Sequence, residues 1–177
     1  MDRRRQAREQ VKEKITGALL RLMGEKSISE ITVTELIAEA GVARASFYRH
    51  YATKESVITT LIEDVLEDFR AGLPADGENF YTRENIRRSF DYFRRYAPQV
   101  TDLHRFGYGD VLLERLNRFH EEVAGTMPCR SIARYRLCIH IGALYYTAMI
   151  WLLNGRRESV DEIADMFCRM VAAREQD

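Results

Sequence analysis

The sequence contains few cysteines, prolines and glycines, and its formal net charge is zero. It has 3 cysteines among 177 residues, and Cys129, Cys138 and Cys168 form no CxxC pair. This set is too small and too oddly numbered for a disulfide framework or a cysteine zinc site. With only 3 prolines and 10 glycines, the chain should consist of helices joined by short connections. Basic and acidic residues balance at 27 each. We therefore expect one soluble protein of the reducing cytoplasm.

The sequence also predicts neither a secretory signal nor a membrane-spanning helix. The basic start, MDRRRQAREQ, runs into an amphipathic stretch and lacks the apolar run of a secretory signal. The longest apolar run, Leu137 to Leu153, has 17 residues and includes His140. That is shorter than the roughly 20 residues of a membrane span. We favour a buried helix of a soluble bundle and expect no membrane partner.

Helical periodicity dominates the rest of the chain, and no segment alternates as a strand would. The apolar spacing predicts an all-α fold of about nine helices. A first long helix covers about residues 5–25, and another covers about 54–70 with Thr53 as its N-cap. An aromatic helix follows a loop at 72–82 and should end at Pro98. The final helices are expected at about 131–153 and from the capping box Ser159 to Glu162 onward.

Two short helices between the first long helices have clear start and stop signals. Thr32 followed by Glu35 is a capping box, and Gly41 is a C-terminal stop. Two short helices joined through a glycine and braced on both sides form a helix-turn-helix. The second would anchor to the core through Phe47 and fit the major groove of DNA. The side chains that it should project outward are Arg44, Ser46, Tyr48, Arg49 and His50.

The charges around this motif favour nucleic acid despite the neutral total. Residues 41–54 contain Arg44, Arg49 and Lys54 without a carboxylate. A second basic cluster, Arg3 to Arg5, precedes the first helix. It could reach phosphates or a minor groove, but a solvated basic end explains it equally well. Basic residues on a short helix are usually just surface, so the DNA interpretation depends on the whole motif.

The segment ITVTELIAEAGVARASFYRHYATKESV resembles the DNA-binding region of TetR/AcrR-type transcriptional regulators. The shared features are a Thr-Val start, an Ala-Gly-Val turn, an aromatic-Tyr pair and a Lys-Glu opening of the next helix. The string RASFYRHY resembles the branch of regulators of dihydroxyacetone-kinase type. The later segment WLLNGRRESVDEIADMF is similar to the C-terminal region of that branch.

This resemblance implies two domains, a helix-turn-helix DNA-binding domain at residues 1–53 and a helical regulatory domain at 54–177. It also implies a homodimer that binds a palindromic DNA operator. The last two helices, from Leu137 to Leu153 and from Glu162 to Met170, would pair between subunits. Family members contact phosphates at positions matching Thr32, Thr34, Ser46, Tyr48, His50 and Lys54, and read bases at positions matching Ala43, Arg44 and Ala45.

The base-reading positions depart from the usual family pattern at two places. Many relatives have Ser where Ala43 stands and Gly where Ala45 stands. The helix thus loses a hydroxyl cap, and its backbone cannot approach a base edge as closely. Methyl contacts to thymine are the natural substitute. Arg44 keeps the donors for a bidentate guanine contact, worth roughly 1 to 3 kcal/mol of discrimination.

Aromatic residues in the second half of the chain could line a small-molecule pocket, although such residues often serve only as core. We take the following as pocket candidates: Tyr92, Phe93, Tyr96, Phe106, Phe119, Tyr145 and Tyr146. His104, His120 and His140 are isolated, so neither a metal site nor a cofactor is expected. No nucleophile, phosphate-loop or HExxH motif indicates an enzyme.

The sequence therefore favours a DNA-binding transcriptional regulator, a repressor that a small-molecule effector releases from its operator. One alternative is a helical small-molecule-binding protein without a DNA role. Another is a DNA-binding module that no effector controls. Binding to a palindromic sequence, or failure to bind one, separates these hypotheses.

Overall fold

The computed structural model describes residues 3–71, 81–124 and 131–172, and all regular structure in these ranges is helical. The predicted all-α class is confirmed. Several predicted features lie outside the described residues. They are Pro128, Cys129, the end of the last predicted helix at about residue 173 and most of the predicted loop at 72–82. The elements are α1 (Arg3–Met23), the short 3-10 turn η1 (Ile28–Glu30), α2 (Val33–Ala40), α3 (Arg44–His50), α4 (Lys54–Ala71), α5 (Arg83–Arg95), α6 (Ala97–Arg105), α7 (Gly109–Ala124), α8 (Ile132–Leu153) and α9 (Val160–Ala172).

The helices divide into two compact units, residues 1–65 and 66–177. The sequence places the boundary between residues 53 and 54, whereas this division falls inside α4. The first half of α4 packs with the N-terminal helices, because Val57, Ile58 and Ile62 are buried. An ion pair between Lys12 of α1 and Asp64 of α4, at 3.6 Å, adds a link on the surface of this unit.

The N-terminal unit has a small hydrophobic core, to which each of its helices contributes one face. Its fully buried side chains are Ile15, Ala18 and Leu19 of α1, Leu36 of α2, Phe47 of α3 and Val57 of α4. At about 25 cal/mol per Å² of apolar surface, a buried Phe or Leu stabilises such a fold by roughly 2 to 3 kcal/mol. The core therefore fixes which sides of α2 and α3 face solvent.

The start of α2 uses two short capping motifs. Ser27 and Glu30 form a reciprocal capping box at η1, within a segment that the sequence indicates only as a polar break. The predicted box at Thr32 and Glu35 is only half formed. The Thr32 hydroxyl accepts from the Glu35 N–H over 3.1 Å, but the Glu35 carboxylate accepts from Lys26 Nζ over 2.6 Å instead. Lys26 thereby holds the pKa of Glu35 below its usual range.

Gly41 ends α2 as the sequence predicts. Its φ of 63° lies in the left-handed region, which glycine adopts without the steric cost of a Cβ. The Val42 N–H then donates to the Ile37 carbonyl over 3.1 Å, and the Gly41 N–H to that of Ala38 over 3.2 Å. This closed turn redirects the chain into α3 within three residues.

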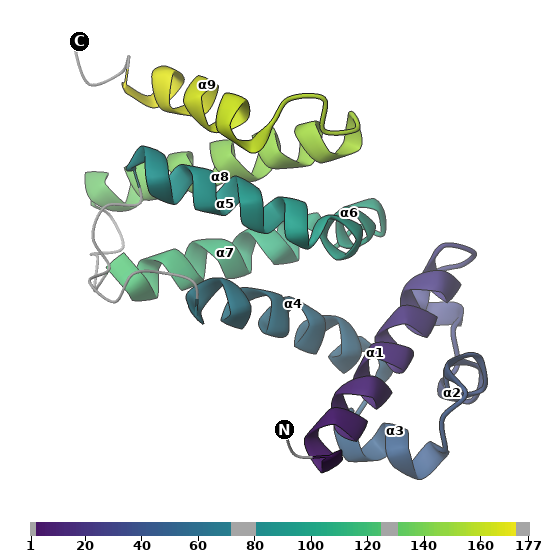
Figure 1. Ribbon diagram of the computed structural model, residues 1–177. Helices are drawn as coiled ribbons and strands as arrows, with labels where there is room; N and C mark the ends of the chain where they lie inside the picture. The colour runs from purple at the N-terminus through teal and green to yellow at the C-terminus, as the bar shows by residue number, and fades with distance from the viewer. Residues whose placement is uncertain (1–2, 72–80, 125–130, 173–177) are drawn as a thin grey trace. The chain divides into compact units, whose positions relative to one another are not determined.

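The C-terminal unit is a bundle in which α5 lies between α9 and α7, with α8 behind it (Figure 1). Three aromatic side chains join these helices in the core. The ring of Phe90 on α5 meets Trp151 of α8 and Phe167 of α9 edge-on, with centroids 6.0 and 5.8 Å apart. Arg83 on the surface of α5 reaches Asp161 and Asp165 of α9 at 3.4 and 2.5 Å.

Pro98 begins a helix instead of ending one, which corrects the sequence prediction. Helix α5 already ends at Arg95, and Pro98 lies in the first turn of α6. Proline fits there because the first N–H groups of a helix have no intrahelical acceptor. The residues after Pro98, as far as Arg105, therefore continue α6.

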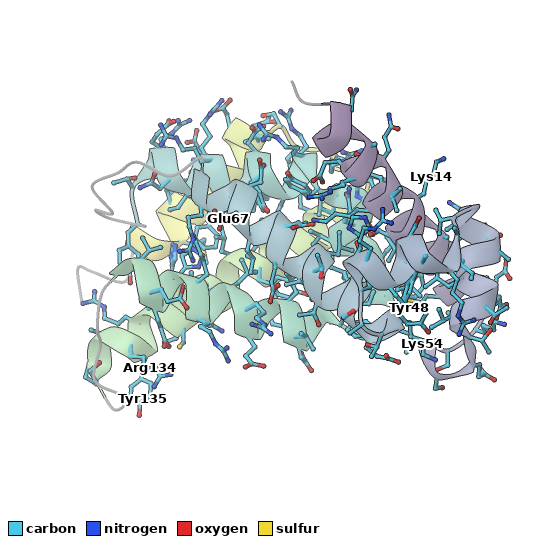
Figure 2. All side chains as sticks on the ribbon, turned by 90° about the horizontal axis from the view of Figure 1, so that it is seen from below. Lys14, Tyr48, Lys54, Glu67, Arg134 and Tyr135 are labelled. Atoms are coloured by element: carbon cyan, nitrogen blue, oxygen red, sulfur yellow. The ribbon has the colours of Figure 1, made fainter. Side chains whose placement is uncertain are left out.

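Helix α8 has one buried face and one exposed face, although its sequence is apolar almost throughout. Leu137, Ile141, Leu144 and Ala148 are buried. The opposite face carries large apolar side chains at helical spacing, and Figure 2 shows one of them, Tyr135, pointing outward. By length and composition α8 could cross a membrane, but half of its most apolar window is buried within the fold. It serves as a core helix, as expected.

Candidate nucleic-acid interface and ligand cavity

Helix α3 presents a basic, carboxylate-free face. Phe47 is fully buried, whereas Arg44, Ala45, Tyr48 and Arg49 are exposed. Buried Phe47 thus sets the rotation of the helix, and the residues two and three positions before it and one and two positions after it face outward. Because a helix of this size fits the major groove of B-DNA, the exposed side chains are placed for contact with base edges and phosphates.

Ala43 occupies the N-cap of α3 and forms no side-chain cap bond, as its lack of a hydroxyl requires. The first turn of α3 is closed by the backbone alone, where the Ser46 N–H donates to the Ala43 carbonyl over 2.9 Å. Ala43 and Ala45 therefore offer only methyl groups beside Arg44. This leaves Arg44 as the side chain at the start of α3 that can donate hydrogen bonds to a base.

The Arg44 guanidinium is held by two hydroxyl groups. Nη1 donates to Thr34 Oγ1 of α2 over 3.3 Å, and Nη2 donates to Tyr48 Oη, one turn along α3, over 3.4 Å. The guanidinium carbon also lies 5.5 Å from the centroid of the Tyr48 ring, within the range of a cation–π contact. The structure thus brings together three of the predicted DNA-contacting residues.

His50 is grouped with basic residues of α1 and α3, a grouping that the sequence analysis did not predict. Burial lowers the pKa of His50, and the charges of Lys12, Arg49 and Arg8 lower it further, against the opposite effect of Glu9. Two basic side chains of α1, Arg8 and Lys12, thus act electrostatically on the end of α3. The spacing in the sequence could have indicated this grouping, because Arg8 and Lys12 are four residues apart and share one face of a helix.

The other predicted contacts have roles within the fold or lie partly covered. Thr32 caps α2, and Ser46 is half-buried. Lys54 turns toward the protein, where its ammonium donates to the carbonyl oxygens of Ile31 and Ser29 over 2.6 and 3.2 Å. The side chains of Arg3 to Arg5 lie outside the described residues.

A small cavity lies in the core of the C-terminal unit and has about 10 Å³ of space open to a water-sized molecule. Its walls come from four helices and consist of Phe69, Ser89, Tyr92, Phe93, Leu116, His120, Ile141, Leu144 and Tyr145. None of these side chains carries a formal charge at neutral pH, because burial lowers the pKa of His120 to about 4. The lining is therefore neutral, and the space in this structure is about that of one water molecule.

Three of the seven predicted pocket residues, Tyr92, Phe93 and Tyr145, line this cavity. Phe119 packs behind it, edge-on to Phe69 at 5.5 Å. The remaining three lie elsewhere. The Tyr96 hydroxyl donates to Asp68 over 2.7 Å, Phe106 caps the end of α6, and Tyr146 is 53% exposed on the outer face of α8. Within the described residues, no three His, Cys, Asp or Glu side chains gather as a metal site.

Two properties of this cavity were not available from the sequence. His120 is nearly fully buried, and its Nδ1 lies 2.7 Å from the Leu116 carbonyl, to which it donates. The Tyr92 hydroxyl is buried and has no hydrogen-bond partner among the residues that the structure describes. Burial raises the pKa of Tyr92 well above its usual value. Both side chains therefore stay neutral near physiological pH.

The N-terminal geometry is that of a helix-turn-helix protein, and comparison with known proteins finds a family whose domain it matches. Residues 15–60 match the family described as bacterial regulatory proteins, tetR family. The chain is 43% identical over 67 residues to the HTH-type transcriptional regulator YxbF of Bacillus subtilis, a match over 38% of this chain and 16% of that protein. It is 30% identical over 86 residues to the HTH-type transcriptional regulator EthR of Mycolicibacterium smegmatis, over 45% and 37% of the two chains.

The matched region thus spans well under half of these curated relatives. Solved structures match nearly the whole fold. A TetR transcriptional regulator from Streptococcus agalactiae covers 95% of this chain and 97% of its own, with a TM-score of 0.64 and 20% identity. The dihydroxyacetone kinase operon activator DhaS covers 93% and 95%, with a TM-score of 0.56 and 12% identity. Residues 15–60 thus match the tetR-family DNA-binding domain, and the fold is similar to that of solved TetR regulators.

Proposed function

We propose that the protein binds a palindromic DNA operator as a homodimer and represses transcription until a small molecule releases it. The observation that carries DNA binding is the exposed face of α3. Arg44 and Arg49 project from it, no acidic residue lies on α3, and buried Phe47 fixes the helix orientation. Such a face attracts phosphates through charge and offers Arg44 for bidentate pairing with guanine.

The proposed dimer surface is an exposed stripe along α8 and α9. Six of its side chains recur at helical spacing on one face of α8, and each is more than half exposed: Ile132, Tyr135, Ile139, Tyr146, Ile150 and Leu153. Met166 and Met170 of α9 are also exposed, and a groove lined by Ile150, Leu153 and Met166 continues the stripe. A continuous apolar surface of this kind needs a partner.

A second copy of the chain is the occupant that we propose for this stripe. The stripe is self-complementary about Gly142 and Ala143, because reversing α8 around that point superposes Ile132 on Leu153 and Ile139 on Tyr146. Two antiparallel copies can therefore match apolar positions along their length, as an isologous two-fold interface requires. A two-fold dimer would carry two α3 helices, which suits a palindromic operator.

The proposed effector is a small, neutral and largely apolar molecule that enters the cavity of the C-terminal unit. At about 10 Å³ the cavity is far smaller than the roughly 300 to 1,000 Å³ of common ligand sites, so effector binding would have to widen it. Phe69 on α4 belongs to its wall. An effector releases DNA only if it binds the conformation with low DNA affinity more tightly than the competent one.

Selection from a random pool of double-stranded DNA tests the proposal. The full-length protein should enrich a sequence with two-fold symmetry, and an electrophoretic shift should show one dimer per site. Binding to all sequences alike, with a steep salt dependence, would instead favour a DNA-binding module that no effector controls. No binding to any DNA would favour a helical small-molecule-binding protein. Addition of the effector to the selected complex should release the DNA.

A further inference from the structure

Arg44 is linked to hydroxyl groups from two different helices, Thr34 of α2 and Tyr48 of α3. We infer that Thr34 and Tyr48 are positioning residues for Arg44 and so determine which base the protein selects. This inference rests on the proposed function, because it assumes that Arg44 reads a base. It assigns to two hydroxyls, expected from the sequence to contact phosphates, a part in sequence specificity.

The hydroxyls restrict a side chain that is otherwise free to move. An exposed arginine has many rotamers, and binding through a single one of them costs conformational entropy. In this structure both terminal nitrogens already donate to oxygen acceptors, at 3.3 and 3.4 Å. The guanidinium is thus ordered before DNA arrives, which lowers the entropy that must be lost when it binds.

The holding contacts leave Arg44 able to bind a base. A guanidinium has five N–H groups, and only two of them are used by Thr34 and Tyr48. Each terminal nitrogen keeps a second N–H, and Nε keeps its own. Two of these donors can pair with the O6 and N7 acceptors of guanine in the major groove. Positioning and base contact are therefore compatible in one conformation.

The support for Arg44 extends into the core. The Tyr48 ring packs edge-on against the buried Phe47 ring, with centroids 5.3 Å apart and planes at 88°. This contact restrains the ring over which the guanidinium lies, 5.5 Å from its centroid. Thr34 approaches from α2, so the turn at Gly41 fixes its distance from Arg44. The position of the guanidinium thereby depends on the packing of both helices.

A phosphate contact and a positioning contact predict different binding profiles. Loss of a phosphate contact weakens binding to every sequence by about the same factor. Loss of a positioning contact weakens binding mainly to the sequence that carries the preferred base, because the alternatives do not use the Arg44 bond. The ratio of affinities for preferred and substituted bases separates the two roles.

The experiment measures this ratio by fluorescence anisotropy, at one salt concentration, with the selected operator and its three variants at the base pair that Arg44→Ala no longer discriminates. Thr34→Val and Tyr48→Phe should each reduce the ratio by roughly 3- to 10-fold, the range expected for one hydrogen bond. Thr34→Ser keeps a hydroxyl and should therefore retain most of the wild-type ratio. Thermal melts verify that each variant is folded.

Ser46→Ala is the matched control, since Ser46 lies on the same helix and does not hold Arg44 in this structure. It should leave the ratio unchanged. Equal losses on all four sequences for Thr34→Val and Tyr48→Phe would overturn the inference and leave both as phosphate contacts, with the proposed function intact. If wild type and Arg44→Ala show the same preferences, Arg44 reads no base and the inference also fails. If the wild type prefers no sequence at all, the proposed function fails as well.

Discussion

The ammonium of Lys54 donates a hydrogen bond to the main-chain carbonyl of Ile31 over 2.6 Å. It also donates to the carbonyl of Ser29 over 3.2 Å, and its side chain is only 17% exposed. The first residue of α4 is thus tied to the segment that leads into α2. The motif places Lys54 among the phosphate contacts, but this geometry directs its charge toward the protein and favours a structural role.

Lys54→Met tests which role dominates. Loss of two charge-assisted bonds to partly buried carbonyls should lower the free energy of unfolding by about 1 to 2 kcal/mol, measured by urea denaturation. The slope of log affinity against log salt should stay unchanged. A phosphate contact predicts the reverse, with normal stability and a slope smaller by about 1. The control is Lys14→Met, because Lys14 projects outward from α1 (Figure 2).

Gly41→Ala should destabilise the helix-turn-helix through backbone conformation alone. A Cβ at Gly41 would meet no atom within 4 Å, but its φ is +63°. An L-residue in this region costs roughly 1 to 2 kcal/mol. The matched change Gly17→Ala lies within α1 and meets only the end of the Arg21 side chain, at 3.5 Å. It should stabilise by about 0.5 to 1 kcal/mol. Chemical denaturation of both variants checks the opposite signs.

The C-terminal unit should lose stability in mild acid. Burial lowers the pKa of His120 and of His140 from 6.5 to about 4. Between these values the unfolded chain binds protons that the folded chain does not, so stability is complete above pH 6.5 and falls as pH drops toward 4. A change from pH 7.5 to 5 should cost about 2 kcal/mol for each histidine.

Urea midpoints at the two pH values measure this loss. His120→Gln should remove about half of the pH dependence, whatever its effect on stability at pH 7.5. A variant with the same dependence as the wild type would show that His120 is not held neutral by the fold. The pH window is diagnostic, because a paired carboxylate also loses its contribution in acid but does so at lower pH than this window.

Ile139→Glu should convert the proposed dimer to a monomer. Ile139 is 59% exposed at the middle of the apolar stripe of α8, and a buried carboxylate without a partner would be costly in a dimer interface. Analytical ultracentrifugation gives the mass, and circular dichroism confirms the fold. Val111→Glu is the control, since Val111 is 40% exposed on α7 and is not one of the stripe residues. A dimeric Ile139→Glu protein would place the interface elsewhere.

The sequence was most informative about features formed by residues that are close together in the chain. The cap at Thr53, the turn at Gly41 and the box at Ser159 and Glu162 involve residues at most five positions apart, and the structure contains all three. Helical periodicity likewise identified Phe47 as an anchor. Pro98 was misassigned because proline fits after a helix and in the first turn of the next one equally well, and only tertiary packing decides.

Contacts between segments could not be obtained from the sequence in the same way. Lys54 meets carbonyls 23 and 25 residues away, and Arg44 meets Thr34 across the turn. The cavity has a similar origin, since its walls come from four helices. Aromatic composition alone therefore selected Tyr146, which is exposed, together with Tyr145, which lines the cavity.

The most direct measurement is methylation interference on the selected operator, with wild-type protein and Arg44→Ala. Methylation of guanine N7 blocks the acceptor that Arg44 would use in the major groove. The account predicts strong interference at one guanine in each half-site, related by the two-fold axis and abolished by Arg44→Ala. Interference that is identical for both proteins, or that lacks two-fold symmetry, would contradict a dimer that reads DNA through Arg44.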